Sequence, residues 1–212
     1  GASSTMTAKK ALGVLVSGRG SNLQAILDAI HAGRLPLAKV GVVISDNPEA
    51  KALLRVRGMG IPTVVLERKA FADRTAYETA LADELERHQV DLVVLAGFMR
   101  ILSACFIQRF PGAIVNIHPS LLPAFPGLDA QGQALRYGVK VAGCTVHFVD
   151  EGMDSGPIIL QEAVPVELGD TTQTLADRIL HVEHRLYPRA IALFCEERLE
   201  IEGRQIHIRS EK

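Results

Sequence analysis

The feature that most constrains the fold of this chain is the alternation, through its first half, of short apolar runs with longer amphipathic segments. The apolar runs are LGVLVS at 12–17, VGVVIS at 40–45, TVVL at 63–66, DLVVLAG at 91–97 and AIVNIH at 113–118. Nearly continuous apolar strands of this kind are typical of a parallel sheet that is buried on both faces. The pattern predicts an α/β protein with a doubly wound, mostly parallel sheet and helices on both faces.

The segments between these runs have the residue spacing of helices. We expect helices over residues 21–30, 48–58 and 103–110, and a longer one that ends near His88. In the longer segment Tyr77, Leu81 and Leu85 recur at helical spacing, and charged residues occupy the other side. We interpret this long helix as scaffold.

The second half of the chain has a different pattern. Two β-rich runs, 141–150 and 156–166, are joined by the acidic stretch EGMDS, which predicts an extended β connection rather than another crossover helix. A long helix is predicted from Thr171 or Thr172, and Pro188 is expected to kink or divide it. The tail at 199–209 has the alternation of a terminal hairpin.

No linker or repeat interrupts the chain, so we expect one domain over residues 6–212. Its two halves run over about 11–110 and about 111–198, followed by the tail hairpin at 199–209. Residues 1–5, which precede Met6, are interpreted as a remnant of cloning.

The composition and net charge limit which classes of molecule we expect as binding partners. The 212 residues are 48% hydrophobic and 22% charged with a net charge of −1, which gives no electrostatic reason to expect a nucleic acid or an anionic membrane. No apolar run approaches the roughly 18 to 20 residues that span a bilayer. Cys105, Cys144 and Cys195 are far apart in sequence, and we expect reduced, largely buried thiols in a cytoplasmic protein.

The first candidate site is the stretch SGRGSNLQ at 17–24, between the first strand and the first helix. Gly18 and Gly20 let the backbone approach a ligand, and the free N–H groups of a helix that opens near Ser21 favour a phosphate. Asn22 adds a further polar side chain. A tight turn with a polar helix cap explains the same residues, because two glycines are a weak signal.

The second candidate site is the pair Asn116 and His118 in VNIHPSLLPAFPG. Residues two apart on a strand point to the same face, and the carboxyl end of a doubly wound sheet is where ligands bind. An amide can donate to an oxyanion and an imidazole can exchange a proton near neutral pH, which together suit acyl transfer. Each side chain alone could instead only bond the end of the strand. The prolines that follow should stiffen the next loop.

The third candidate site is Asp154 in the acidic stretch VDEGMDSGP. A solvated turn accounts for such a stretch, and its spacing supports no metal site. A further interpretation is that Asp154 meets His118 in space, orients its ring and favours its protonated form.

Other titratable residues carry weaker signals. HVEH at 181–184 lacks the four-residue spacing of the helical zinc pattern, and His147 and Cys105 have no evident chemical companion in the sequence. We therefore predict no metal. Asp46, which ends the second apolar run, keeps a dinucleotide site open as an alternative, although Leu23 stands where that fingerprint has its third glycine.

Four motifs in this order, GRGSNLQ, LAGFMRIL, NIHPSLLPAFPG and the Asp of EGMDSGP, resemble the phosphoribosylglycinamide formyltransferase family of folate-dependent enzymes. The resemblance covers about Leu12 to Glu197. It implies transfer of the formyl group of 10-formyltetrahydrofolate to the amine of glycinamide ribonucleotide in purine biosynthesis, by a monomer or homodimer. The same resemblance implies a phosphate-binding first half and a folate-binding, catalytic second half.

The resemblance also implies roles for matching residues. Asn116 would bind the oxyanion, His118 would take part in proton transfer, and Asp154 would hold and tune His118. The substrate's phosphate and ribose would meet Gly20, Ser21, Asn22 and Glu183. The reduced folate would meet Met99, Arg100, Ile101, Leu102, Asp150, Glu151 and Gly152, with Arg100 facing its glutamate tail. Asp129 and Gln131 stand where some members have His.

Three alternatives stay open at this point. The first is a hydrolase that passes the formyl group of 10-formyltetrahydrofolate to water. The second is an NAD-dependent dehydrogenase, against which Leu23 argues. The third is a nucleotide-binding module without catalysis, which would leave Asn116, His118 and Asp154 unexplained.

Overall fold

The computed structural model describes residues 8–211, so the interpretation of residues 1–5 lies outside the described residues. The elements, in chain order, are β1 (Lys10–Val16), α1 (Ser21–His31), β2 (Ala38–Ser45), α2 (Ala52–Arg55), β3 (Thr63–Val65), the 3-10 turn η1 (Arg68–Ala70), α3 (Arg74–Arg87), β4 (Leu92–Leu95), α4 (Ala104–Arg109), β5 (Ile114–His118), α5 (Ala130–Tyr137), β6 (Val141–Phe148), β7 (Ile158–Pro165), α6 (Thr172–Cys195), β8 (Leu199–Glu202) and β9 (Gln205–Ile208).

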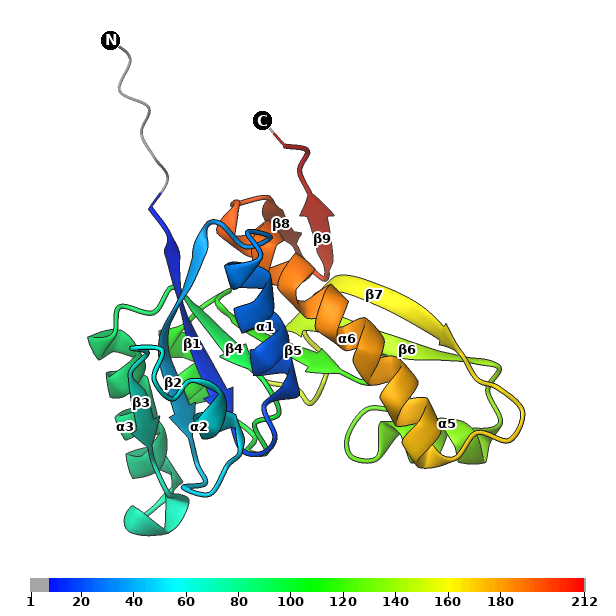
Figure 1. Ribbon diagram of the computed structural model, residues 1–212, viewed down its shortest axis with the longest axis horizontal. Helices are drawn as coiled ribbons and strands as arrows, with labels where there is room; N and C mark the ends of the chain where they lie inside the picture. Colours follow the sequence, from blue (N-terminus) through cyan, green and yellow to red (C-terminus); the bar gives the residue numbers. More distant parts are fainter. Residues whose placement is uncertain (1–7, 212) are drawn as a thin grey trace.

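Seven of these strands form one sheet in the order β3-β2-β1-β4-β5-β6-β7 (Figure 1). Strands β1 to β5 are parallel to one another. Strands β6 and β7 are antiparallel to their neighbours. The predicted doubly wound, mostly parallel sheet with a β-rich second half is therefore confirmed. The predicted tail hairpin forms as the antiparallel pair β8 and β9.

The topology brings the candidate motifs together at the carboxyl ends of the parallel strands. β1 lies between β2 and β4, so the chain order reverses there, and a doubly wound sheet binds ligands in the crevice at such a reversal. The loops that follow β1, β4 and β5 leave from the carboxyl ends of neighbouring parallel strands. These loops carry SGRGSN, the stretch from Gly97 to Leu102, and the proline-rich stretch after His118.

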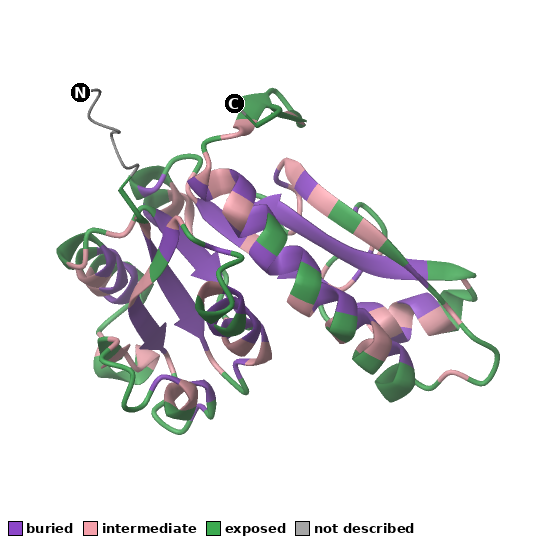
Figure 2. Ribbon diagram, turned by 45° about the horizontal axis from the view of Figure 1, so that its top comes forward, coloured by how far each residue is buried: buried purple, intermediate pink, exposed green. Residues whose placement is uncertain are grey.

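Helices cover both faces of the sheet, and each face has its own apolar core. On one face α1 and α6 lie side by side, and residues such as Leu23, Ile26 and Ile179 are fully buried against the strands (Figure 1). On the other face α3 and α4 bury Leu81 and Phe106 in a second core. Figure 2 shows the central strands of the sheet buried, and the outer sides of the helices and the tail hairpin exposed. The burial of whole strands explains their continuous apolar sequences.

Three details of the fold differ from the sequence predictions. The helix expected over 48–58 is only Ala52–Arg55, because the N–H of Ala52 bonds the carbonyl of Gly18 and fixes where that helix begins. The helix over 130–137 was missed, although Asp129 caps its start and Gly138, at φ 87°, ends it. Cys105 is exposed and only Cys144 and Cys195 are buried, so the expectation of buried thiols is wrong for Cys105.

The sequence predicts that Pro188 kinks or divides the last helix, and the structure shows that it does not divide it. α6 runs from Thr172 to Cys195 with Pro188 inside it. Tyr187, Ala190 and Ile191, which flank the proline, are at most 1% exposed. Tertiary packing of these neighbours outweighs the cost of the missing N–H, which in an isolated helix is about 3 kcal/mol.

Candidate active site

His118, the last residue of β5, is held from two sides. Its Nε2 lies 2.8 Å from the carbonyl oxygen of Phe125, in the proline-rich loop. A carbonyl only accepts, so Nε2 carries a hydrogen and Nδ1 is the nitrogen that exchanges a proton. Nδ1 lies 3.5 Å from Oδ2 of Asp154. Because both side chains are mostly buried, the carboxylate interacts with the ring through little intervening water.

The loop and turn that surround His118 are themselves fixed. Asp154 Oδ2 accepts a hydrogen bond of 2.8 Å from the backbone N–H of Gly127, which ties the acidic turn to the proline-rich loop. Thr145 on β6 accepts from the N–H of Leu122 and donates to the carbonyl of Ser120. These hydrogen bonds hold the loop after β5 in place beside His118.

Asn116 lies two residues before His118 on β5, half-buried, and its amide makes no hydrogen bond with any described residue. A free amide beside a held imidazole is available to a ligand atom. His147 on β6 pairs directly with Asn116 across the two strands, and Nε2 of His147 is buried without a partner. Burial is the main cause that lowers the pKa of His147, and the charges of Asp154 and His118 also act on it.

His147 is thus a member of this cluster that the sequence analysis set aside. The signal that could have found it is the antiparallel pairing of the runs 113–118 and 141–150, which puts His147 opposite Asn116. That register cannot be derived from either run alone.

The glycine loop after β1 has the geometry of an anion site. Gly20 has φ 72°, in the left-handed region, and directly precedes α1, whose first N–H groups are left free as in any helix. α2 supports the loop from behind, because Ala52 N–H bonds Gly18 and Arg55 Nε bonds the carbonyl of Arg19 at 2.7 Å. The side chain of Ser21 makes no hydrogen bond with any described residue.

Asn22 and Glu183 are brought together from α1 and α6. Asn22 Nδ2 donates to Glu183 Oε1 at 3.1 Å, and both side chains are buried. Burial is the main cause that raises the pKa of Glu183 to about 7, and the Asn22 hydrogen bond opposes it. The amide oxygen of Asn22 is buried without a partner. The sequence analysis placed both residues at the ribonucleotide but not in contact with each other.

Arg19 in this loop and Arg55 of α2 place positive charge near it, and Asp28 of α1 opposes them. His184, next to Glu183, has its Nε2 buried without a partner. Burial is the first cause that lowers the pKa of His184, followed by the charges of His181, Arg55 and Arg19. Groups that disfavour another cation at this position favour an anion there.

The stretch Met99 to Leu102 lines a pocket at the same edge of the sheet, and its apolar side chains are available to a ligand. Met99 is 70% exposed and Ile101 71%, whereas Leu102 is buried. The stretch is tied to the glycine loop, because the N–H of Met99 donates to Oγ of Ser17 at 2.9 Å.

Arg100 is already paired. Its Nε donates to Asp46 Oδ2 at 2.9 Å, and its guanidinium lies over the ring of Tyr77. Asp46 at the end of β2, which kept the dinucleotide alternative open, is therefore occupied by Arg100. Tyr77 and Glu78 of α3 line this pocket too, so the view of α3 as scaffold alone is incomplete.

Asp150, Glu151 and Gly152 do not line the pocket formed by Met99 to Leu102. Asp150 accepts from the N–H of Gly152 and from Oγ of Ser155, as in an ordinary turn, and Glu151 accepts from Gln108. Among residues 8–211 no group of three or more His, Cys, Asp or Glu side chains could hold a metal ion. No helix in that part of the chain combines the length and apolar character needed to span a bilayer.

Fold and site together define a doubly wound α/β protein with a glycine loop after β1. An amide and an imidazole lie on β5, and a carboxylate from the turn before β7 faces the imidazole. The profile of the family described as formyl transferase matches residues 10–191, and the chain belongs to this family.

Within this family, the chain is similar to phosphoribosylglycinamide formyltransferases. The phosphoribosylglycinamide formyltransferase of Bacillus subtilis is 46% identical over 182 residues, which is 86% of this chain and 93% of that protein. The trifunctional purine biosynthetic protein adenosine-3 of Drosophila melanogaster is 50% identical over 87% of this chain and 14% of its own length. The crystal structure of glycinamide ribonucleotide transformylase 1 from Symbiobacterium toebii matches with a TM-score of 0.93 and 55% identity, covering 95% of each chain.

A hydrolase of the same fold is more distant. A formyltetrahydrofolate deformylase from Pseudomonas syringae matches with a TM-score of 0.88 and 28% identity, covering 95% of this chain and 66% of that one. The fold therefore serves both formyl transfer and formyl hydrolysis among its relatives, and identity favours the transferases.

Proposed function

We propose that this protein transfers the formyl group of 10-formyltetrahydrofolate to the amine of glycinamide ribonucleotide, giving formylglycinamide ribonucleotide and tetrahydrofolate for purine biosynthesis. The observation that carries the proposal is the contact of His118 Nδ1 with Asp154 beside the free amide of Asn116, at the sheet edge that also carries the glycine loop. The names of the Bacillus subtilis and Symbiobacterium toebii relatives support the same reaction.

The chemistry follows from the three side chains. The substrate amine attacks the formyl carbon, and the carbonyl oxygen becomes an oxyanion that accepts a hydrogen bond from the Asn116 amide. Protonated at Nδ1, His118 adds its positive charge beside this oxyanion. As the tetrahedral intermediate collapses, the bond from the formyl carbon to N10 of the folate breaks and N10 takes up a proton from His118. The attacking nitrogen gives its extra proton to the now neutral His118, which restores the imidazolium.

Asp154 acts on these reaction steps through His118. Its carboxylate lies 3.5 Å from Nδ1 and holds the ring in one orientation. Gly127 N–H holds Asp154 in turn, so the acid is positioned before a substrate arrives. His147 is the cross-strand partner of Asn116 on β6 and is itself buried.

The ribonucleotide is assigned to the glycine loop. Its phosphate would take the free N–H groups at the start of α1, with Gly20, Ser21 and Asn22. Its ribose hydroxyls would meet Glu183, whose second carboxyl oxygen makes no hydrogen bond with a described residue. The folate would lie along Met99, Arg100, Ile101 and Leu102, which line a pocket. Asp150, Glu151 and Gly152 lie outside that pocket and are proposed as folate contacts on the family resemblance alone. As a further part of the proposal, the enzyme acts in the cytoplasm.

Release of tetrahydrofolate with and without glycinamide ribonucleotide tests the proposal. Release that requires the ribonucleotide, with one formylated product for each tetrahydrofolate, is the expected result. Equal release without it would identify a hydrolase such as the Pseudomonas syringae relative. Absence of any folate turnover would reopen the nucleotide-binding alternatives.

A further inference from the structure

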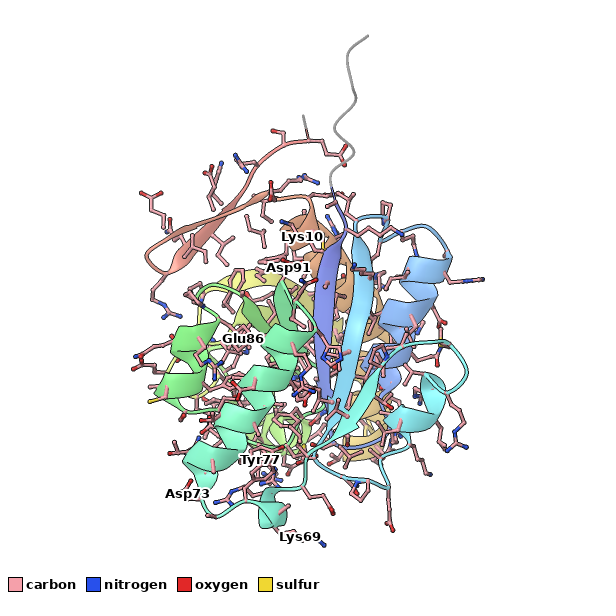
Figure 3. The ribbon with its side chains drawn as sticks, turned by 90° about the vertical axis from the view of Figure 1, so that its left-hand side faces the viewer. Lys10, Lys69, Asp73, Tyr77, Glu86 and Asp91 are labelled. Atoms are coloured by element: carbon pink, nitrogen blue, oxygen red, sulfur yellow. The ribbon has the colours of Figure 1, made fainter. Side chains whose placement is uncertain are left out.

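Gln161, on the edge strand β7, lies in one row with His118. Thr145 of β6 pairs with His118 of β5 on one side and with Gln161 of β7 on the other. Residues paired directly across antiparallel strands point to the same face of the sheet. Figure 3 shows Lys10 at the end of the sheet where the parallel strands begin and Tyr77 at the end where they finish. The row lies at the second of these ends, because His118 is the last residue of β5.

The loop after β5 folds back over this row, and the two side chains beyond His118 satisfy its backbone. Thr145 Oγ1 donates to the carbonyl of Ser120 at 2.7 Å and accepts from the N–H of Leu122 at 3.1 Å. Nε2 of Gln161 donates to the carbonyl of Leu122 at 2.9 Å and to Oγ1 of Thr145 at 3.0 Å. Within residues 8–211 no other group donates to the carbonyl of Leu122. A hydroxyl has one hydrogen and two lone pairs, so Gln161 completes the bonding of Thr145.

The part of the loop that is held in this way leads directly to the carbonyl that fixes the ring of His118. The hydroxyl of Ser120 donates to the carbonyl of Ala124 at 2.5 Å, which closes residues 120–124 into one turn. Phe125 follows this turn, and its carbonyl oxygen lies 2.8 Å from Nε2 of His118. The hydrogen bonds from β6 and β7 to the turn therefore set where the Phe125 carbonyl lies.

We propose that Gln161 is a positioning residue, which acts through the loop after β5 to keep the hydrogen of the neutral His118 ring on Nε2. Two acceptors compete for that single hydrogen, the Phe125 carbonyl at Nε2 and the Asp154 carboxylate at Nδ1. When the carbonyl moves away, the hydrogen goes to Nδ1, and the nitrogen that takes up a proton during turnover is blocked. The role in turnover rests on the proposed function, whereas the place of this hydrogen does not.

Nitrogen NMR of isotopically labelled histidine rings tests this role, because a ring nitrogen with a hydrogen and one without differ in chemical shift. The His118 signals are identified by their loss in His118→Ala. In the wild-type protein without substrates, at a pH where the ring is neutral, we expect the hydrogen on Nε2. Gln161→Glu keeps the size of the side chain but removes its donors, and should move the hydrogen to Nδ1 in a large share of the molecules. Gln161→Met, which also lacks a donor, should shift the hydrogen in the same direction.

Turnover and a control variant separate positioning from general damage. Both Gln161 variants should lose roughly ten-fold in kcat, as expected when a proton-transfer group is slightly displaced, with KM for each substrate changed by less than about two-fold. The matched control is Gln205→Met on β9, an exposed strand glutamine outside the row. This control should keep both the hydrogen on Nε2 and the kcat of the wild-type protein.

A hydrogen that stays on Nε2 in both Gln161 variants would overturn the proposal even if kcat falls, because the loss would then not pass through His118. Wild-type kcat in both variants would also overturn it, and so would an equal shift of the hydrogen in Gln205→Met. Gln161 is exposed and belongs to neither apolar core, so its variants should fold. If the hydrogen moves in the Gln161 variants but the wild-type protein makes no formylglycinamide ribonucleotide, the positioning is supported and only the proposed function is contradicted.

Discussion

Nε2 of His118 keeps its proton and Nδ1 can exchange one, because the two groups that face these nitrogens differ chemically. The Phe125 carbonyl accepts from Nε2 and cannot donate, while the Asp154 carboxylate faces Nδ1. A histidine arranged in this way can cycle between protonated and neutral forms without turning its ring. The proton balance of the reaction therefore depends on the side chains of His118 and Asp154.

His118→Ala and Asp154→Asn should each lower kcat by roughly 10² to 10⁴-fold, the usual effect of removing a general acid or base. Both should keep a melting temperature close to that of the wild-type protein, because neither residue belongs to the apolar cores. The control is Asp177→Asn on the exposed side of α6, which should keep wild-type kcat. A variant at either residue with near-normal turnover would remove that residue from the mechanism.

Glu183 should make folding stability depend on pH. Burial raises its pKa from 4.5 to about 7 in the folded protein, so between these values the folded state holds a proton that the unfolded state has lost. Folding stability must then fall as pH rises through this window. The full cost, roughly 3 kcal/mol, is present above about pH 7 and absent below about pH 4.5.

Glu183→Gln should remove that pH-dependent cost. The difference in unfolding free energy between the variant and the wild-type protein should therefore grow in favour of the variant as pH rises from 4.5 to 7. Urea unfolding at a series of pH values measures it. A difference that stays constant across the window would show that Glu183 titrates alike in the folded and unfolded states.

At the residue scale, the sequence predicts pairs of side chains on the same strand better than pairs from two different elements. Asn116 and His118 are predictable because alternation along one strand fixes their common side. The contacts Asp46 with Arg100 and Asn116 with His147 depend on strand order and register. Those are properties of the packed sheet, which local patterns do not encode.

At the element scale the glycine loop owes its shape to its fit against α2. A Cβ on Gly20 would lie 2.4 Å from Cβ and 2.8 Å from Cα of Ala52, and its φ of 72° already strains any other residue. Gly18 in the same loop has open space instead. The two glycines are therefore not equivalent, although the motif gives them equal weight.

Gly20→Ala should destabilise the fold by roughly 1 to 3 kcal/mol through strain and overpacking, and should raise KM for the ribonucleotide as the loop shifts. Gly18→Ala provides the matched control and should change stability far less. Thermal unfolding and steady-state kinetics measure the two effects. Equal destabilisation by both substitutions would contradict the close contact with α2.

Tyr187 connects α6 to the strands that carry the site. Its hydroxyl lies 2.7 Å from the carbonyl of Leu95 and 3.1 Å from that of Val115, and the side chain is fully buried. Burial keeps the pKa of this phenol well above its usual value, so the hydroxyl stays a donor throughout the working pH range. This anchor also explains why α6 passes through Pro188 without dividing.

Tyr187→Phe should cost about 1 to 3 kcal/mol of unfolding free energy, because two buried carbonyls lose their shared donor. Tyr137→Phe is the control, since that side chain is exposed. Urea denaturation compares the two variants. A neutral Tyr187→Phe would mean that the carbonyls find other partners and that α6 is held by apolar packing alone.

Prediction at the element scale succeeds where burial is complete and fails where ends are set by tertiary contacts. The strands of the first half are all predicted. The apolar runs of β1, β4 and β5 reflect burial on both faces, whereas the edge strand β3 is largely exposed. The start of α2 and the continuity of α6 through Pro188 were not predicted. They depend on a bond to Gly18 and on packing around Tyr187, which lie far away in sequence.

For the whole molecule, the sheet order explains how stretches more than a hundred residues apart form one site. The loops after β1, β4 and β5 meet at one edge, α6 adds Glu183 from one face, and the turn before β7 adds Asp154. Two ligand regions thus flank one proton-transfer group. Direct transfer between two bound substrates requires this arrangement, since water must be kept from the formyl carbon.

The most direct test of this account is a single-turnover experiment with 10-formyltetrahydrofolate that is isotopically labelled in the formyl carbon. Enzyme in excess is mixed with the labelled folate and glycinamide ribonucleotide, and the label is followed into the ribonucleotide and into formate. We predict that essentially all of the label appears in formylglycinamide ribonucleotide, at the rate at which tetrahydrofolate forms. Label in formate, or label that leaves the folate equally fast without the ribonucleotide, would contradict direct transfer at this site.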